Sequence, residues 1–390
     1  MRSLVGATAL LVLMAVPSAL SLCRADTVYQ QTNLVSDIQG LAQVTDPSLV
    51  NPWGVSFSGT SPFWVSDTGK NLATLYVVNA SGVSKNALEV AVPTTGSGPQ
   101  GPTGQVFNST ASDFVIPADN AKASFIFSNL NGTISAWNGG LTPNTQAVVV
   151  ATTTGGNYTG LALGGNASGS LLYAANNAAG KIDVFNGSFA PVSLGANAFA
   201  NPAGLPAGLV PFNVQNINGN IYVTYAPAGH AAQTSAAQGQ GAVAEFDSSG
   251  NFKAGSLIVG GKLAAPWGVT VAPASFGTFG GDLLVGNFSY AFSEINAYDP
   301  VTGAFRGTLS DANGNPIINQ GLWAINFGNG GNGGDVNTLY FGAGIMGETH
   351  GLFGAIAPAA APVPEPSTIV LLLTGGLVLQ GIGCWRKRRA

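Results

Sequence analysis

Residues 51–57, NPWGVSF, open a phrase that recurs along the chain and decides its fold. It returns as APWGVTV at 265–271 and, with changes, as GPTGQVF at 101–107, NYTGLAL at 157–163, LVPFNVQ at 209–215 and GLWAINF at 321–327. Counted from the second residue of each opening, with the looser fourth copy aligned at Pro211, the steps are 50, 56, 53, 55 and 56 residues. A period near fifty residues with several strands per unit is typical of a propeller blade.

Each opening is followed by further short apolar runs separated by turn signals. In the first unit these are FWVSD at 63–67 and TLYVVNASG at 74–82. Their alternation of apolar and polar residues predicts strands, and no segment of the body keeps a 3.6-residue apolar period for three turns. The sequence therefore predicts an all-β chain, a six-bladed β-propeller, and excludes helical repeats. Five or seven blades stay open because the fourth unit is the weakest copy.

An early run, TVYQQTNLV at 27–35, belongs to none of the six units. We expect it to pair with the last blade near residues 352–356 and so close the ring. Closure hides sheet edges that would otherwise favour aggregation.

The composition supports many short strands joined by tight turns. Charged residues make up 8% of the chain, hydrophobic residues 46%, and 55 of 390 residues are glycine. The region from 26 to 365 holds seven basic and 17 acidic residues, a net charge of −10. Such an acidic body excludes nucleic acid as a partner, because binding DNA or RNA needs Lys and Arg against phosphates.

The two cysteines, Cys23 and Cys384, both lie in terminal segments, so the body has no internal disulfide. Residues 1–25 have the pattern of a signal peptide: Arg2, an apolar run over 4–22, and a small residue, Ala25, at the expected cleavage site. The domains expected are thus a signal peptide at 1–25, the propeller at 26–360 and a tail at 361–390.

The tail has three parts in a fixed order: a Pro-Glu-Pro tripeptide, an apolar stretch at 369–385 and a basic cluster. The apolar stretch is just long enough to cross a thin bilayer, and the basic cluster would stay cytoplasmic. The residues of the tripeptide and the cluster are Pro364, Glu365, Pro366, Arg386, Lys387, Arg388 and Arg389.

This tail resembles the PEP-CTERM sorting signal of Gram-negative bacteria. The resemblance implies that an exosortase is a partner, and that 369–385 holds the protein in the inner membrane until the tail is processed. It further implies a cell-surface or extracellular location, with extracellular polysaccharide as a candidate partner. An ordinary C-terminal anchor is the alternative interpretation.

The openings, above all NPWGVSFSGTSPFWVSDTG at 51–69 and PWGVTV at 266–271, also resemble the NHL-type propeller repeat. The body as a whole looks like an uncharacterised propeller family whose members often carry PEP-CTERM tails. The resemblance implies a fold that hosts both binding proteins and enzymes, so it does not decide between these functions.

Polar residues end most of the expected second strands and form one candidate site. If the strands are equivalent, these side chains ring the channel mouth, where their oxygen atoms would suit Ca²⁺ or another hard cation. The alternative is turn chemistry, in which Asp and Asn bind the backbone two residues on. The candidates are Asp67, Asn129, Asn176, Tyr225 and Asn287.

A second candidate is Glu348 with His350, two residues apart in GIMGETHGLFG at 344–354, where both side chains could reach the channel. The other histidine, His230, lies in a long insertion of the fourth unit. For histidines in loops, a structural hydrogen bond is the competing interpretation.

Trp53, Trp267 and Trp323 occupy the same position in three openings. Packing between blades explains them best, with sugar binding as the alternative.

Two hypotheses for function follow. The first is an exported surface or extracellular-matrix protein that binds or builds structure, since no G-x-S-x-G, H-E-x-x-H or P-loop motif occurs. The second is a metal-dependent, Ca-type hydrolase or lactonase with its site at the channel mouth.

Overall fold

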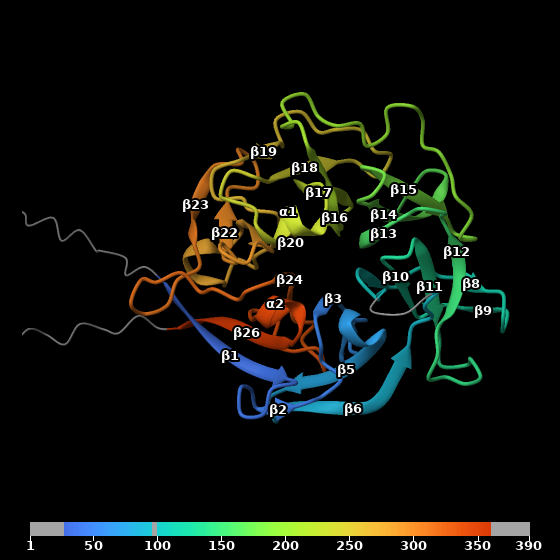
Figure 1. Cartoon of the computed structure of the whole chain (residues 1–390), viewed down its shortest axis with the longest axis horizontal. Coiled ribbons are helices and arrows are strands. Elements are labelled where there is room, and N and C mark those ends of the chain that lie inside the picture. Colours follow the sequence, from blue (N-terminus) through green and yellow to red (C-terminus); the bar gives the residue numbers. More distant parts are fainter. Residues whose placement is uncertain (1–26, 96–99, 360–390) are drawn as a thin grey trace, which may run out of the picture.

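The computed structural model describes residues 27–95 and 100–359, and these form six sheets arranged around a central axis (Figure 1). The predicted six-bladed propeller is confirmed. The expected signal peptide and the tail, including 369–385, lie outside the described residues.

Five blades follow one another along the chain, each running from an inner to an outer strand. Blade 1 has β3 (Pro52–Ser56), β4 (Phe63–Asp67), β5 (Leu72–Asn79) and β6 (Gly82–Ala91). Blade 2 has β7 (Gln105–Phe107), β10 (Phe125–Ser128), β11 (Thr133–Trp137) and β12 (Val148–Thr152). Blade 3 has β13 (Tyr158–Asn166), β14 (Gly169–Asn176) and β15 (Lys181–Asn186). Blade 4 has β16 (Leu209–Ile217), β17 (Asn220–Pro227), β18 (Ala242–Phe246) and β19 (Ile258–Val259). Blade 5 has β20 (Pro266–Val271), β21 (Leu283–Asn287), β22 (Ile295–Tyr298) and β23 (Phe305–Thr308).

Blade 6 joins the two ends of the propeller. From the axis outward it has β24 (Leu322–Phe327), β25 (Leu339–Ala343), β26 (Leu352–Ala359), β1 (Val28–Ser36) and β2 (Val44–Thr45). β1 pairs antiparallel with β26 from Val28 opposite Ala359 to Ser36 opposite Leu352. The expected closure by the early strand is therefore confirmed.

The remaining elements are short. A hairpin of β8 (Val115–Ile116) and β9 (Ala121–Lys122) extends from blade 2, and two 3₁₀ turns cover Thr68–Lys70 and Gly277–Phe279. Helices α1 (His230–Thr234) and α2 (Ile345–Glu348) interrupt blades 4 and 6, and both lie near the centre of the ring (Figure 1). Within 27–95 and 100–359, none of the helices is long and apolar enough to cross a bilayer.

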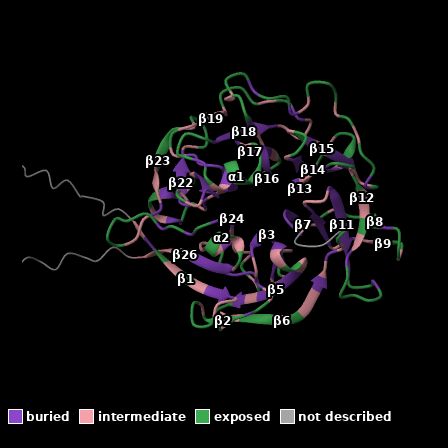
Figure 2. Ribbon diagram, in the orientation of Figure 1, coloured by how far each residue is buried: buried purple, intermediate pink, exposed green. Residues whose placement is uncertain are grey.

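Burial explains the repeated phrase. The second strands are almost wholly buried and the inner strands are buried where they begin, whereas outer strands and loops carry most of the exposed residues (Figure 2). The glycine at the fourth position of four openings faces the inner strand of the next blade, so a side chain there would collide with its neighbour. Those residues are Gly54, Gly104, Gly160 and Gly268. A Cβ atom on Gly104, for example, would lie 2.4 Å from the backbone nitrogen of Leu161.

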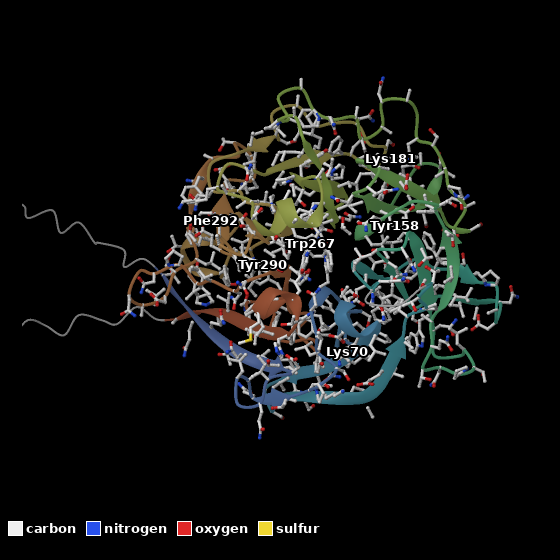
Figure 3. All side chains as sticks on the ribbon, viewed as in Figure 1. Lys70, Tyr158, Lys181, Trp267, Tyr290 and Phe292 are labelled. Atoms are coloured by element: carbon white, nitrogen blue, oxygen red, sulfur yellow. The ribbon has the colours of Figure 1, made fainter. Side chains whose placement is uncertain are left out.

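The three equivalent tryptophans meet at the axis, where Figure 3 labels Trp267 near the centre of the ring. Trp53 stacks on Trp323 with ring centroids 3.6 Å apart, and Trp267 meets Trp323 edge-on at 5.8 Å. Phe288 stacks on the other side of Trp323 at 3.9 Å. All four rings are at most 4% exposed, so packing is their role, as the sequence predicts.

Candidate functional site

One face of the propeller carries a pocket of about 780 Å³. It opens where the inner strands begin and the second strands end. We call it the mouth pocket. It is lined by Asn51, Trp53, Thr68, Gly69, Leu130, Asn157, Thr159, Asn177, Ala178, Ala228, Gly229, His230, Gln233 and Glu348.

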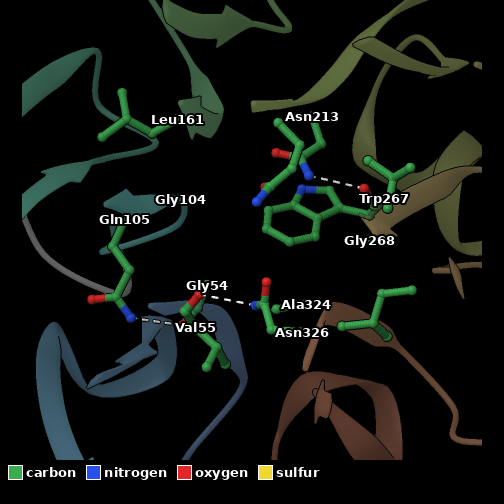
Figure 4. Close-up of a pocket in the computed structure, with 13 residues that line it drawn as sticks. Gly54, Val55, Gly104, Gln105, Leu161, Asn213, Trp267, Gly268, Ala324 and Asn326 are labelled. Atoms are coloured by element: carbon green, nitrogen blue, oxygen red, sulfur yellow. Dashed lines mark hydrogen bonds between the residues drawn. The ribbon is translucent and has the colours of Figure 1, made fainter. Parts of the chain in front are cut away.

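The mouth pocket does not continue into an open channel. At the start of blade 1, Asn51 and Trp53 line the pocket, whereas Gly54 and Val55 of β3 line a separate axial cavity of only about 10 Å³ (Figure 4). That volume holds a single water at most. A third cavity of about 330 Å³, lined in part by Phe57, opens beyond it. The buried tryptophan layer thus gives the mouth pocket a floor.

The five residues of the predicted cation ring are all buried, and none lines the mouth pocket. Asp67 and Asn176 end β4 and β14, Asn287 ends β21, Asn129 directly follows β10, and Tyr225 lies within β17.

Three of these side chains join the second strand of a blade to its third. The Thr74 hydroxyl donates to Asp67 Oδ2 at 2.7 Å, and Asn129 Nδ2 donates to Thr133 Oγ1 at 2.8 Å. Asn176 Nδ2 donates to Asp183 Oδ2 at 2.7 Å. These contacts give the residues a structural role inside their own blades.

Asn287 is held by backbone groups at the start of its own blade, and Tyr225 is buried within β17. Asn287 Nδ2 donates to the Lys262 carbonyl at 2.8 Å, and its Oδ1 accepts from the Ala264 N–H at 3.0 Å. Burial raises the pKa of Tyr225, as it raises the pKa of Asp67 well above the usual value. Burial disfavours the ionised form of a carboxyl, which is the form that binds cations. Among the described residues, no group of three or more His, Cys, Asp or Glu side chains is arranged to hold a metal ion.

Sequence reasoning missed the pocket by one position. The residue directly after a candidate lines the mouth pocket in three blades: Thr68 after Asp67, Leu130 after Asn129, and Asn177 after Asn176. The buried Asp and Asn therefore anchor the turns, and the next residue faces the ligand space.

Glu348 and His350 contact different partners, and only Glu348 lines the mouth pocket. His350 Nδ1 contacts Asp37 Oδ2 at 2.7 Å, and the Gly351 N–H donates to Asp37 Oδ1. Glu348 has a backbone φ of +67°, which turns its side chain away from that pair and into the mouth pocket. Side chains two residues apart lie on the same face in a β-strand, but the segment from Glu348 to His350 is not a strand.

Glu348 instead contacts the other histidine. His230 Nε2 lies 2.7 Å from Glu348 Oε2, and the side chains are 56% and 12% exposed respectively. Its hydrogen bond to Glu348 raises the pKa of His230 above the ordinary value of 6.5. The pair links the insertion of blade 4 to the loop before β26, and these are the two longest connections between a second and a third strand.

No family model matches the chain. Two uncharacterised proteins of Acanthamoeba polyphaga mimivirus are similar to it over 343 residues, at 28% and 26% identity. Each match covers 85% of this chain, and 81% and 87% of the respective viral protein.

Solved structures share the fold at low sequence identity. A streptogramin B lyase is 11% identical with a TM-score of 0.50, over 86% of this chain and 99% of the lyase. A protein of unknown function from Bacteroides thetaiotaomicron is 12% identical with a TM-score of 0.50, over 85% of this chain and 76% of that protein. The chain is therefore a six-bladed β-propeller whose fold is similar to that of the streptogramin B lyase.

Proposed function

We propose that the chain is an exported cell-surface or extracellular-matrix propeller that binds a small uncharged molecule in its mouth pocket. One observation carries the binding half of this proposal: a pocket of about 780 Å³ above the buried tryptophan layer. Volumes of about 300–1,000 Å³ are usual for small-molecule sites.

The chemistry of the walls favours an uncharged ligand. The ionisable side chains of the described lining are His230 and Glu348, and they contact each other at 2.7 Å, so neither is free to pair with a charged ligand. The other lining side chains are amides, hydroxyls and apolar groups. A charged ligand would lose its hydration there without gaining an opposite charge.

Unused hydrogen-bonding groups support the same conclusion. In the described part of the chain, no hydrogen bond reaches Asn157 Oδ1 or Gln233 Oε1, although the amide nitrogens of both residues donate to protein oxygens. The buried Nε1 of Trp53, a lining residue, also has no partner there. Buried polar groups are normally paired, so the Trp53 N–H points to a polar ligand or an ordered water, and the two amide oxygens are free to accept from the same ligand.

A thermal-shift screen tests the binding half of the proposal. The library contains uncharged sugars, esters and lactones, with carboxylates and amines of matched size. We expect uncharged compounds to raise the melting temperature. A ligand at a hundred times its Kd stabilises by about 2.7 kcal/mol. Equal shifts from charged compounds, or no shift from any uncharged one, would contradict the proposal.

The export half rests on the order of the tail: Pro-Glu-Pro, apolar stretch, basic cluster. We expect Glu365→Ala to leave the protein uncut in the inner membrane of a Gram-negative host with an exosortase. Pro362→Ala, just outside the tripeptide, serves as the control and should be processed normally. Immunoblots of membrane and medium fractions measure the outcome. Equal release of both variants into the medium would show that the exosortase does not recognise the tripeptide.

A further inference from the structure

Glu348 stands at the centre of a hydrogen-bond network that draws on four blades. Its Oε1 accepts from Asn51 Nδ2 at 3.1 Å. Its Oε2 accepts from the Tyr290 hydroxyl at 3.1 Å and faces His230 Nε2 at 2.7 Å. Three donors on one carboxylate fix both its position and its orientation.

The floor of the pocket holds this network in place. Trp323 Nε1 donates to Asn51 Oδ1 at 2.8 Å, which turns the amide nitrogen of Asn51 toward Glu348. Met346 and Glu348 both have left-handed backbone conformations, with φ of +52° and +67°. Such conformations are costly for residues other than glycine and occur often at functional sites. The carboxylate of Glu348 therefore reaches the pocket wall from a backbone segment that is strained at two positions.

The contact with Glu348 sets the tautomer of His230. Nε2 faces the carboxylate and carries the proton, so Nδ1 of the neutral ring keeps its lone pair. Among the described residues, Nδ1 has no hydrogen-bond partner, and the ring lines the mouth pocket. The titratable groups around the ring are Glu348 and, on the same oxygen, Tyr290. A histidine oriented by a carboxylate, with one nitrogen free beside a pocket, has the geometry of a general base.

We propose that His230 and Glu348 form a catalytic dyad that hydrolyses a neutral ester or lactone held in the mouth pocket. This rests on the proposed function, because it uses the same pocket. His230 Nδ1 takes a proton from water while the water oxygen bonds to the carbonyl carbon. The acyl carbon–oxygen bond then breaks, and the proton passes from the imidazolium to the departing alkoxide. The products are a carboxylic acid and an alcohol.

The nucleophiles available in the pocket narrow the reaction class. Among the described residues, the lining contains no Ser or Cys, and the two hydroxyls there are in use: Thr68 donates to the Pro102 carbonyl and Thr159 to the Phe212 carbonyl, both at 2.6 Å. Water is therefore the nucleophile. Glycoside hydrolysis needs two carboxylates, and Glu348 is the one carboxylate in the lining.

The test is hydrolysis of p-nitrophenyl acetate by the full chain and three variants across pH 5–9. We expect the wild-type rate to rise with pH as His230 loses its proton, with an inflection above pH 6.5. His230→Gln should lower the rate of hydrolysis about 100-fold or more, because a general base accelerates such a reaction by about 10²–10⁴-fold. Glu348→Gln should retain some activity and move the inflection to lower pH, because the charge partner of the imidazolium is gone.

His350→Gln is the matched control, because His350 also pairs with a carboxylate but does not line the pocket. Its rate and pH profile should equal those of wild type. A wild-type rate no higher than that of His230→Gln, or an inflection that Glu348→Gln does not move, overturns the dyad. If uncharged ligands still bind in the thermal-shift screen, the dyad alone fails. If none binds, the proposed function fails as well.

Discussion

Gly104→Ala is expected to destabilise the propeller by about 3 kcal/mol, at the upper end of the range for overpacking a buried site. A Cβ at this position would lie 2.4 Å from the backbone nitrogen of Leu161 and 2.7 Å from the carbonyl carbon of Gly160. Both atoms belong to the segment that forms the inner strand of blade 3, so no flexible side chain can move aside. The methyl group must push two blades apart at the axis.

Gly59→Ala is the control for that substitution. Gly59 is exposed, and an added Cβ would meet no atom within 4 Å. Its free energy of unfolding should stay within about 0.5 kcal/mol of wild type. Urea denaturation of both variants measures the difference. If Gly104→Ala proved as stable as Gly59→Ala, the inner strands would not approach each other as the structure has them.

Trp323→Ala is expected to cost about 3–5 kcal/mol, the usual range for removing a buried aromatic side chain. Trp323 is fully buried between Trp53 and Phe288, with ring centroids 3.6 and 3.9 Å away. Its removal would leave a cavity on the axis and take the floor from the mouth pocket. It would also leave Asn51 Oδ1 without the donor that orients it.

Trp323→Phe separates packing from hydrogen bonding. The phenyl ring keeps much of the stacking but loses the N–H that binds Asn51, so we expect a loss of about 1–2 kcal/mol. The two variants are compared by urea denaturation, and equal losses would mean that packing contributes little. A loss below about 1 kcal/mol for Trp323→Ala would contradict the close-packed aromatic layer.

The sequence predicts the architecture because a blade is a local unit. The repeated opening marks each inner strand, and the structure explains its glycine by the close approach of neighbouring blades. The closure of β1 on β26 could also be predicted, since one strand was left over and a ring has no free edge.

The candidate site could be predicted only in part. Asp67 and Asn176 lie at the strand ends where a ring of ligands is expected. However, an Asp or Asn at a strand end gives the same sequence pattern whether it binds a cation or stabilises a turn. Burial and the contacts with the third strand favour the second role.

The pair of His230 and Glu348 could not be predicted from spacing, because the two residues lie in loops of different blades and only the ring brings them together. One signal was present in the sequence. The insertion before β18 and the loop before β26 are the two longest connections between a second and a third strand, and they carry the two histidines. Function in repeat proteins often lies in such insertions.

The central claim is that the mouth pocket is the binding site, and calorimetric titration of the strongest uncharged ligand from the screen tests it most directly. Ala178 is exposed and lines the pocket, whereas its exposed neighbour Ala179 does not. We predict that Ala178→Trp fills the pocket and weakens binding at least tenfold, while Ala179→Trp binds as wild type does. Equal affinity of all three proteins for the ligand would contradict the claim.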